Sequence, residues 1–198
     1  MSLKCTFPTS REDVQRLRAK WIPRAQGLVA EIGFGEGSNV PFFDSGVREL
    51  MAIDRDIEMT DPLQNRLKIL PFPVLLSRAD AERIPVREGV FDCVVCTWTL
   101  CSVKSPSKAL MEVKRVLKPG GIFLFLEHGF ADRLPIQLFQ DLWTPIQKVV
   151  ADGCHINRQI LFEIGAAGFQ LDEFEQTYLR GFPPFSFVSA GIARKPAE

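Results

Sequence analysis

The chain has 198 residues, 46% of them hydrophobic, so it can bury a sizeable core and is too apolar to be disordered. Its 24 basic and 24 acidic residues give a formal net charge of zero, which argues against a nucleic-acid-binding protein with its basic excess. The five cysteines, an odd number, do not indicate a secreted disulfide scaffold and favour a reducing compartment. No apolar run approaches the roughly 20 residues that cross a bilayer, and no signal-peptide core follows residues 1–4. We therefore expect a cytoplasmic protein without a membrane span.

Helices and strands are expected to alternate up to about residue 130. From hydrophobic periodicity and turn residues, the expected helices are 10–22, 38–43, 57–69 and 105–117, and the expected strands are 28–32, 48–54, 73–77, 91–98 and 121–128. This alternation predicts an α/β fold with a parallel sheet and helices on both faces. The strand at 91–98 is apolar on both faces, so we expect it to be central.

The pattern changes after residue 130. Two helices are expected, at 134–150 with Pro145 inside and at 158–167, followed by strands at 169–179 and 185–195. Two strands so close together favour an antiparallel hairpin at the sheet edge. The expected organisation is a single domain over 1–198: an N-terminal helix (about 10–22), a cofactor-binding core (about 28–130) and a helical cap with the edge hairpin (about 131–195).

A glycine-rich turn, "EIGFGEG" at 31–37, follows the first expected strand. Gly33, Gly35 and Gly37 allow the backbone to approach a ligand closely, and a helix start can supply N–H groups to a negative group. Asp54 ends the second strand, where its carboxylate can accept two hydrogen bonds from a ribose diol. Asp80 follows the third strand, where an adenine edge could be recognised. Together these features predict a nucleotide-containing ligand.

Two classes of cofactor compete for this site. A dinucleotide fingerprint has the spacing G-x-G-x-x-G, as in dehydrogenases. Here Gly33-x-Gly35-x-Gly37 is one residue shorter, which suits a ligand without a pyrophosphate. S-adenosylmethionine, an adenosine with a charged amino-acid tail, therefore fits better than NAD.

The motifs resemble those of class I S-adenosylmethionine-dependent methyltransferases. "VAEIGFGEG", "AIDRD", "RADAERIPVREGVFDCVVCTWTLCSV" and "EVKRVLKPGGIFLFLEH" follow in that family's order, and the resemblance covers about residues 28–195. Within the family, "VVCTWTLCSVK", "LKPGGIFLFLEH" and "DGCHINR" resemble the methyltransferase-like seven group, whose animal members are alkyl-thiol S-methyltransferases. The resemblance implies a Rossmann-like, seven-stranded, mostly parallel sheet with an antiparallel C-terminal edge hairpin.

The resemblance also implies roles for individual residues. Glu31, Gly33 and Gly37 would line the site for the methionine part of the cofactor, with Gly35 in the same turn. Asp54 would hold the ribose hydroxyls. The implied roles at the remaining positions are Arg55 beside the adenine, Asp80 at its amino group, Ala81 against its ring and Thr97 near the reacting methyl. The chain departs from the group in lacking an apolar N-terminal anchor, in Phe34 and in His155.

Methyl transfer mainly requires positioning, and a thiol acceptor needs little help to ionise. His128 follows the fifth strand, where it could be a base or could cap the strand end. His155, next to Asp152 and Cys154, could line the acceptor pocket, but a position in a polar loop between helices is favoured. No metal site is expected, because Cys93 and Cys96 lie three apart on a strand and point to opposite faces.

The predicted function is methyl transfer from S-adenosylmethionine to a small, mostly apolar acceptor, with a thiol as the first choice. The chain has sixteen phenylalanines, and this aromatic composition favours such an acceptor. Candidates to line an apolar pocket include Trp143, Phe182 and Phe185. Cys101 is the one cysteine that could lie near the site, although a buried structural role is favoured for it. Alternatives are a C- or O-methyltransferase of quinone-like or phenolic molecules and a non-catalytic methyltransferase-like binding module. We expect no nucleic-acid partner and a monomer or weak homodimer.

Overall fold

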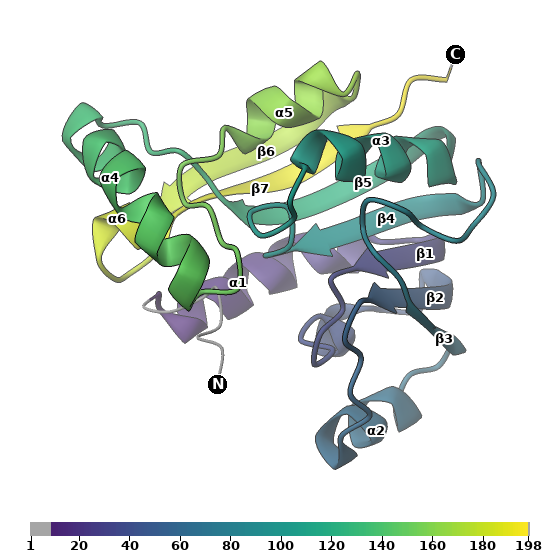
Figure 1. Ribbon diagram of the computed structural model, residues 1–198. Helices are drawn as coiled ribbons and strands as arrows, with labels where there is room; N and C mark the ends of the chain where they lie inside the picture. Colours follow the sequence, from purple (N-terminus) through teal and green to yellow (C-terminus); the bar gives the residue numbers. More distant parts are fainter. Residues whose placement is uncertain (1–8, 198) are drawn as a thin grey trace.

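The computed structural model describes residues 9–197, in which seven strands form one sheet in the order β3-β2-β1-β4-β5-β7-β6 (Figure 1). The strands are β1 (Gly27–Ile32), β2 (Val47–Asp54), β3 (Val74–Arg78), β4 (Phe91–Thr97), β5 (Leu117–His128), β6 (Gln170–Tyr178) and β7 (Phe187–Arg194). Strands β1 to β5 pair in parallel, and β7 is antiparallel to both β5 and β6. The predicted Rossmann-like, mostly parallel sheet with an antiparallel C-terminal pair is confirmed.

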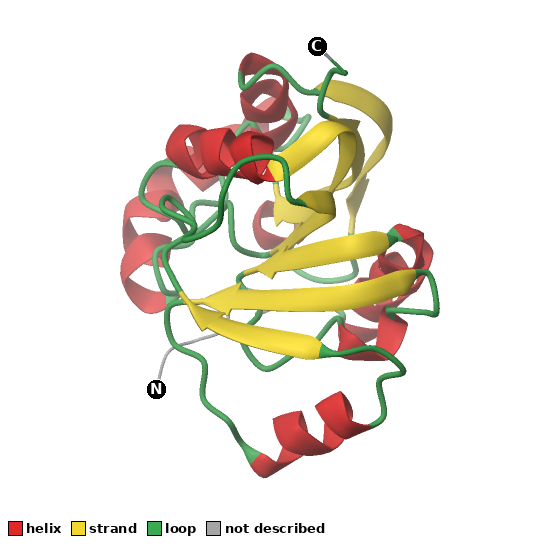
Figure 2. Ribbon diagram, turned by 90° about the vertical axis from the view of Figure 1, so that its right-hand side faces the viewer, coloured by secondary structure: helices red, strands yellow, loops and turns green. Residues whose placement is uncertain are grey.

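Helices cover both faces of this sheet (Figure 2). They are α1 (Arg11–Trp21), α2 (Asp61–Lys68), α3 (Pro106–Val116), α4 (Leu134–Val150), α5 (Ile160–Ala166) and α6 (Pro183–Ser186), with 3₁₀ turns η1 (Ile22–Arg24) and η2 (Val40–Phe42). Successive residues of a strand point to opposite faces, so each strand supplies two cores. In β1, Val29 packs in the core under α1, while Ala30 packs in the core under α3 and α5.

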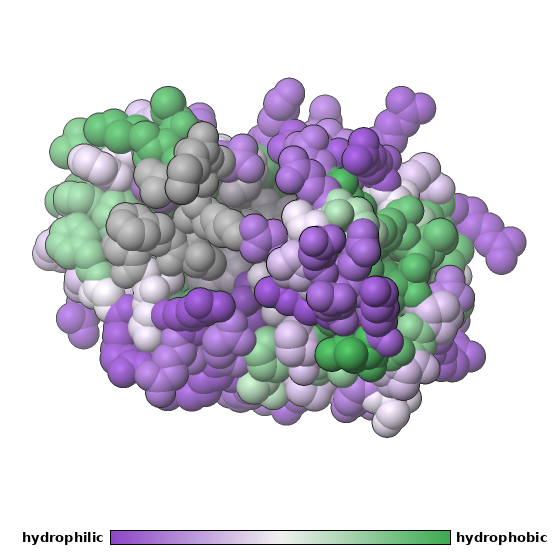
Figure 3. Space-filling model, turned by 90° about the horizontal axis from the view of Figure 1, so that it is seen from below, coloured by the Kyte–Doolittle hydropathy of each residue, from purple (hydrophilic) through white to green (hydrophobic). Residues whose placement is uncertain are grey.

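Helix α4 differs from the others in its exposed side. Apolar side chains that repeat along it are exposed, and they gather on the left of the molecule in Figure 3. They are Leu134, Leu138, Leu142, Ile146, Val149 and Val150. None of the helices in residues 9–197 combines the length and apolar composition that a bilayer span requires.

Local differences from the expected elements have physical reasons. The expected helix at 38–43 is a turn followed by the short η2, because Gly35 and Gly37 take positive φ and Pro41 provides no N–H. The two prolines at 183–184 start the short α6 rather than a simple hairpin turn. Residues 1–4, which we interpreted as lacking a signal peptide, lie outside the described part of the chain.

Candidate active site

A cavity of about 730 Å³ lies at the carboxyl ends of the central strands. Ile32, Asp54 and Thr97, the last residues of β1, β2 and β4, all line it. Strand order reverses between β1 and β4, since β1 is followed on one side by β2 and β3 and on the other by β4 and β5. Ligands of doubly wound sheets bind at such a point. The topology therefore creates the cavity where the motifs predicted a ligand.

The glycine turn forms one side of the cavity. Gly33, Gly35 and Gly37 have φ of 76°, 52° and 67°, a region that other residues rarely adopt. A Cβ added to Gly33 would lie 1.7 Å from Thr99 Oγ1, so glycine is required there for packing as well. Gly33 and Gly35 line the cavity, whereas Gly37 does not, and a Cβ at Gly37 would lie 2.8 Å from Leu63 Cδ1.

A chain of buried polar groups runs beneath the turn. The Asn39 side-chain amide donates to Glu31 Oε1 over 2.9 Å and to Thr97 Oγ1 over 3.0 Å. Burial raises the pKa of Glu31 to about 8, and the hydrogen bond from Asn39 and the charge of Arg18 only partly oppose this rise. Arg18 enters from α1 and is also buried, which lowers its pKa.

Three atoms of these buried polar side chains have no hydrogen-bond partner among the described residues: Glu31 Oε2, Asn39 Oδ1 and Arg18 Nε. Leaving a buried polar atom unsatisfied costs roughly 1–3 kcal/mol, so such atoms indicate where a ligand binds. Glu31 and Asn39 offer acceptors for an ammonium, and Arg18 offers a donor for a carboxylate. An α-amino acid carries both groups, so the set is suited to the tail of S-adenosylmethionine.

Arg18 and Asn39 were not predicted as site residues. Arg18 had a readable signal, because it occurs at helical spacing among Val14, Leu17 and Trp21, on the apolar face of α1. A charged residue on a buried helix face indicates a partner or a ligand. Asn39 had no such signal, since its burial depends on the irregular turn after Gly37.

The predicted nucleoside-binding residues also meet at the cavity. Asp54 accepts backbone hydrogen bonds from Gly35 over 2.8 Å and from Asp56 over 3.0 Å, and each of its carboxylate oxygens keeps room for a further donor. Asp80 accepts a bond from the Glu82 backbone over 2.9 Å. The predicted residues that line the cavity are Glu31, Gly33, Gly35, Asp54, Arg55, Asp80, Ala81 and Thr97.

His128, the candidate base, is buried and is not among the residues that line the cavity. Its Nδ1 lies 3.4 Å from Cys154 Sγ, and its ring packs edge-on against Trp98 with the centroids 4.6 Å apart. Trp98 does line the cavity, and it takes a positive φ of 56° although it is not a glycine. Its buried Nε1 finds no acceptor within residues 9–197.

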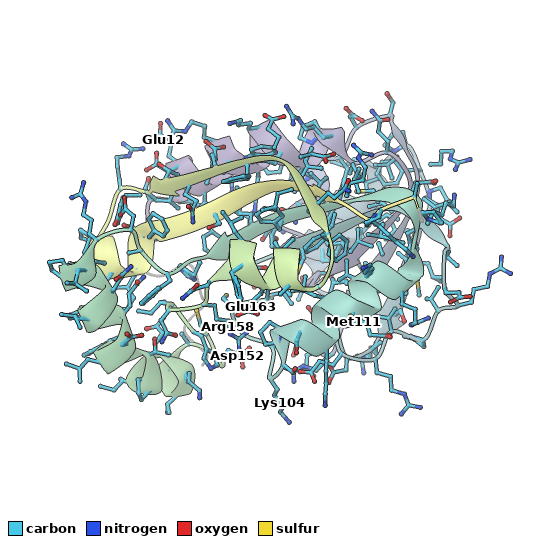
Figure 4. All side chains as sticks on the ribbon, turned by 90° about the horizontal axis from the view of Figure 1, so that it is seen from above. Glu12, Lys104, Met111, Asp152, Arg158 and Glu163 are labelled. Carbon is cyan, nitrogen blue, oxygen red and sulfur yellow. The ribbon has the colours of Figure 1, made fainter. Side chains whose placement is uncertain are left out.

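The side of the cavity beyond Thr97 is built by two loops. Ser102, Val103 and Lys104 follow β4, and Asp152 comes from the loop between α4 and α5. Arg158 joins the loops, since its guanidinium donates to the carbonyl oxygen of Leu100 and, over 2.6 Å, to that of Val103. Figure 4 shows Asp152 and Arg158 close together, on the side of the molecule that carries Lys104.

A buried carboxylate fixes the loop after β4. Glu127 accepts backbone hydrogen bonds from Thr99 and Leu100, both over 2.9 Å, and from Cys101 over 3.1 Å. His155 lies against the same loop, with Nδ1 2.7 Å from the Gly153 oxygen and 3.2 Å from the Cys101 oxygen. It does not line the cavity, in agreement with the expected loop position.

Comparisons with known proteins agree with this geometry. A family model described as a methyltransferase domain matches residues 30–125. The thiol S-methyltransferase TMT1B of Homo sapiens is 32% identical over 179 residues, which cover 87% of this chain and 71% of that protein. TMT1B of Rattus norvegicus is 34% identical over 172 residues, covering 81% and 66%. The chain thus spans about two thirds of the length of these relatives.

A similar solved structure is that of the N-methyltransferase NodS of Bradyrhizobium japonicum in complex with S-adenosylhomocysteine. Its TM-score is 0.69 at 18% sequence identity, and the match covers 96% of this chain and 88% of the NodS chain. At that identity the likeness concerns the fold alone. The sequence relatives, the family model and the methyltransferase fold agree with one another. The chain therefore belongs to the class I S-adenosylmethionine-dependent methyltransferases, in the family that includes the thiol S-methyltransferase TMT1B.

Proposed function

We propose that this methyltransferase transfers the methyl group of S-adenosylmethionine to the sulfur of a small, mostly apolar thiol. The observation that carries the proposal is the pair of unsatisfied buried atoms of Arg18 and Glu31, which line one cavity with Asp54. Asn39, which also has an unsatisfied atom, lies behind Glu31 and donates a hydrogen bond to it. The thiol is supported by the relatives, which are named thiol S-methyltransferases.

The residues of the cavity suit the parts of this cofactor in order. Arg18 and Glu31 would hold the amino-acid tail, with Asn39 orienting Glu31 from behind, and Asp54 would accept hydrogen bonds from the ribose hydroxyls. At the other end, Asp80 and Ala81, with Arg55 beside them, would hold the adenine. When bound, S-adenosylmethionine supplies a methyl group on a positively charged sulfur, which a thiolate can attack directly.

The chain's own contribution is then orientation and the exclusion of water. Thr97 and Trp98 lie at the end of β4, on the side of the cavity where the loops carrying Lys104 and Asp152 would receive the acceptor. The Lys104 ammonium favours an ionised acceptor electrostatically. A free thiol has a pKa of about 8.5, so a modest shift yields enough thiolate near neutral pH.

A base is therefore not required for a thiol, and a phenol or alcohol would need one in the cavity. The catalytic role of His128 stays a prediction, and its burial away from the cavity does not favour direct contact with the acceptor. The cytoplasmic location and the monomeric or weakly dimeric state also stay predictions.

The test is a methyl-transfer assay with S-adenosylmethionine and three acceptors of matched size: an alkanethiol, a phenol and a quinol. We expect a methyl thioether and S-adenosylhomocysteine in equal amounts. At a cofactor concentration that half-saturates the wild type, Asp54→Ala should have lower activity, and Asp172→Ala, which removes the ion pair with Arg194 away from the cavity, should keep it. Methylation of the phenol or quinol alone would favour the O- or C-methyltransferase instead. Cofactor binding without turnover of any acceptor would favour a binding module.

A further inference from the structure

Three side chains that commonly bind metals meet behind the acceptor side of the cavity. Cys101 lies in the loop after β4, His128 ends β5, and Cys154 lies in the loop between α4 and α5. Their ligand atoms all lie within 4.8 Å of one another, and each residue is at most 1% exposed. None of the three lines the cavity, so the cluster is not part of the cofactor site.

The distances suit three of the four ligands of a tetrahedral metal ion. With metal–sulfur bonds of about 2.3 Å and metal–nitrogen bonds of about 2.0 Å, the ligand atoms of a zinc site lie about 3.5–3.8 Å apart. Cys154 Sγ and His128 Nδ1 are 3.4 Å apart, and the whole cluster needs to contract by no more than about 1 Å. Two cysteines and a histidine form a donor set that zinc prefers over calcium or magnesium.

The backbone holds the two cysteines in place. The His155 N–H donates to the Cys101 oxygen over 2.7 Å, which ties the second loop to the first. Gly153 approaches the first loop so closely that an added Cβ would lie 2.8 Å from the Ser102 oxygen. Asp152 adopts a positive φ of 50°, an unusual conformation that places Cys154 at the turn.

Arg158 also lies beside the cluster, because its guanidinium donates hydrogen bonds to the carbonyl oxygens of Leu100 and Val103, in the loop that carries Cys101. Two thiolates balance the charge of a divalent ion, so the complex can be buried among Ala151, Ile156 and their neighbours. Cys93 is also buried, but it lies in the sheet core, outside this cluster.

We propose that Cys101, His128 and Cys154 bind one zinc ion. The ion would fasten together the segments that carry Trp98, Ser102 and Asp152, which line the acceptor side of the cavity. This inference replaces our sequence-based expectation of no metal, which considered only Cys93 and Cys96. It does not depend on the proposed thiol acceptor, and a His128 that binds zinc through Nδ1 is not available there as a base.

The test is the metal content of the full-length protein purified under reducing conditions, followed by zinc titration of the metal-free protein against a chromophoric chelator. We expect about one zinc per chain. Cys101→Ser and Cys154→Ser should each weaken zinc binding by more than about 100-fold, because loss of a ligand exceeds loss of an outer-shell partner. Cys93→Ser, a buried cysteine outside the cluster, is the matched control and should keep the metal.

Cobalt substitution provides a measurement that does not rely on the variants. Cobalt bound by thiolates gives a sulfur-to-metal charge-transfer absorption in the near ultraviolet, which we expect for the wild type and for Cys93→Ser. If the serine variants fail to fold, His128→Cys serves as the test in their place. It replaces one zinc ligand by another and should therefore retain zinc. The proposal is overturned if the reduced wild-type protein binds neither zinc nor cobalt in this way. A hydrogen bond between the Cys154 thiol and the His128 imidazole would then account for their short separation.

Discussion

The charge of Glu31 should control cofactor binding, because its pKa of about 8 keeps the carboxyl mostly protonated at neutral pH in the ligand-free protein. The ammonium of S-adenosylmethionine or S-adenosylhomocysteine requires the ionised form. Binding is therefore expected to release a proton and to strengthen as the pH rises. The perturbation is the pH itself, with Glu31→Gln as the variant that cannot ionise.

The size of the effect follows from the titration. With a pKa of about 8, about 1% of Glu31 is ionised at pH 6 and about half at pH 8. The dissociation constant of S-adenosylhomocysteine should therefore fall about 50-fold between these pH values, while the free amino acid's ammonium stays mostly protonated. The sign for stability is the opposite. Since the pKa of Glu31 is raised in the folded, ligand-free protein, the free energy of unfolding falls as the pH rises from about 4.5 to about 8. Over this range the unfolded chain loses the Glu31 proton while the folded protein retains it.

The assay is calorimetric titration with S-adenosylhomocysteine at several pH values, in buffers of different ionisation enthalpy to count released protons. Glu31→Gln should bind about 10–100-fold more weakly than the wild type at pH 8 and should lose most of the pH dependence, because it lacks the charge-assisted bond. A wild-type affinity that does not change between pH 6 and pH 8 would refute the reasoning. So would an equal pH dependence in the variant.

Other variants test the remaining parts of the site. Asp54→Ala should weaken S-adenosylhomocysteine binding by about 1–3 kcal/mol in calorimetry, and an unchanged affinity would remove Asp54 from the ribose site. Arg18→Met should weaken S-adenosylhomocysteine binding by about 1.5–3 kcal/mol. Its affinity for 5′-methylthioadenosine, which lacks the amino-acid tail, should stay unaltered. Equal losses for both ligands would contradict the assignment of Arg18 to the tail. In thermal or urea denaturation, Gly33→Ala should lower the free energy of unfolding by about 3 kcal/mol or more. Gly35→Ala should lower it by only about 1–2 kcal/mol, because the added Cβ would meet nothing within 4 Å. Similar losses for the two variants would argue against the packing at Gly33. Trp98→Phe should raise the KM of the thiol acceptor several-fold and leave cofactor affinity unchanged, and an unaffected KM would exclude its N–H from acceptor binding.

The sequence was most informative where structure follows from local pattern. Apolar strands such as 91–98, capped helices and the glycine spacing predicted the sheet and most residues of the cofactor site. Asp54 and Asp80 could be assigned because the carboxyl ends of parallel strands meet at one edge of the sheet. The position of such residues depends on few long-range contacts.

The sequence was less informative where position depends on tertiary packing. The cluster of Cys101, His128 and Cys154 brings together residues 53 positions apart in the chain, from Cys101 to Cys154, through loops that have no periodicity. His128 was expected near the acceptor from its place after β5, but the pairing of β5 with β7 and the approach of the α4–α5 loop bury it. Arg18 and Asn39 become site residues only once α1 and the turn after Gly37 pack beside Glu31.

The most direct test of the central claim is calorimetric titration of the purified protein at about pH 8 with S-adenosylhomocysteine and, in parallel, with NAD. We predict micromolar binding of one S-adenosylhomocysteine per chain and no binding of NAD, because the spacing Gly33-x-Gly35-x-Gly37 is one residue shorter than a dinucleotide fingerprint and Glu31 is suited to an ammonium. Binding of NAD, or of neither ligand, would contradict the assignment of the cavity to S-adenosylmethionine.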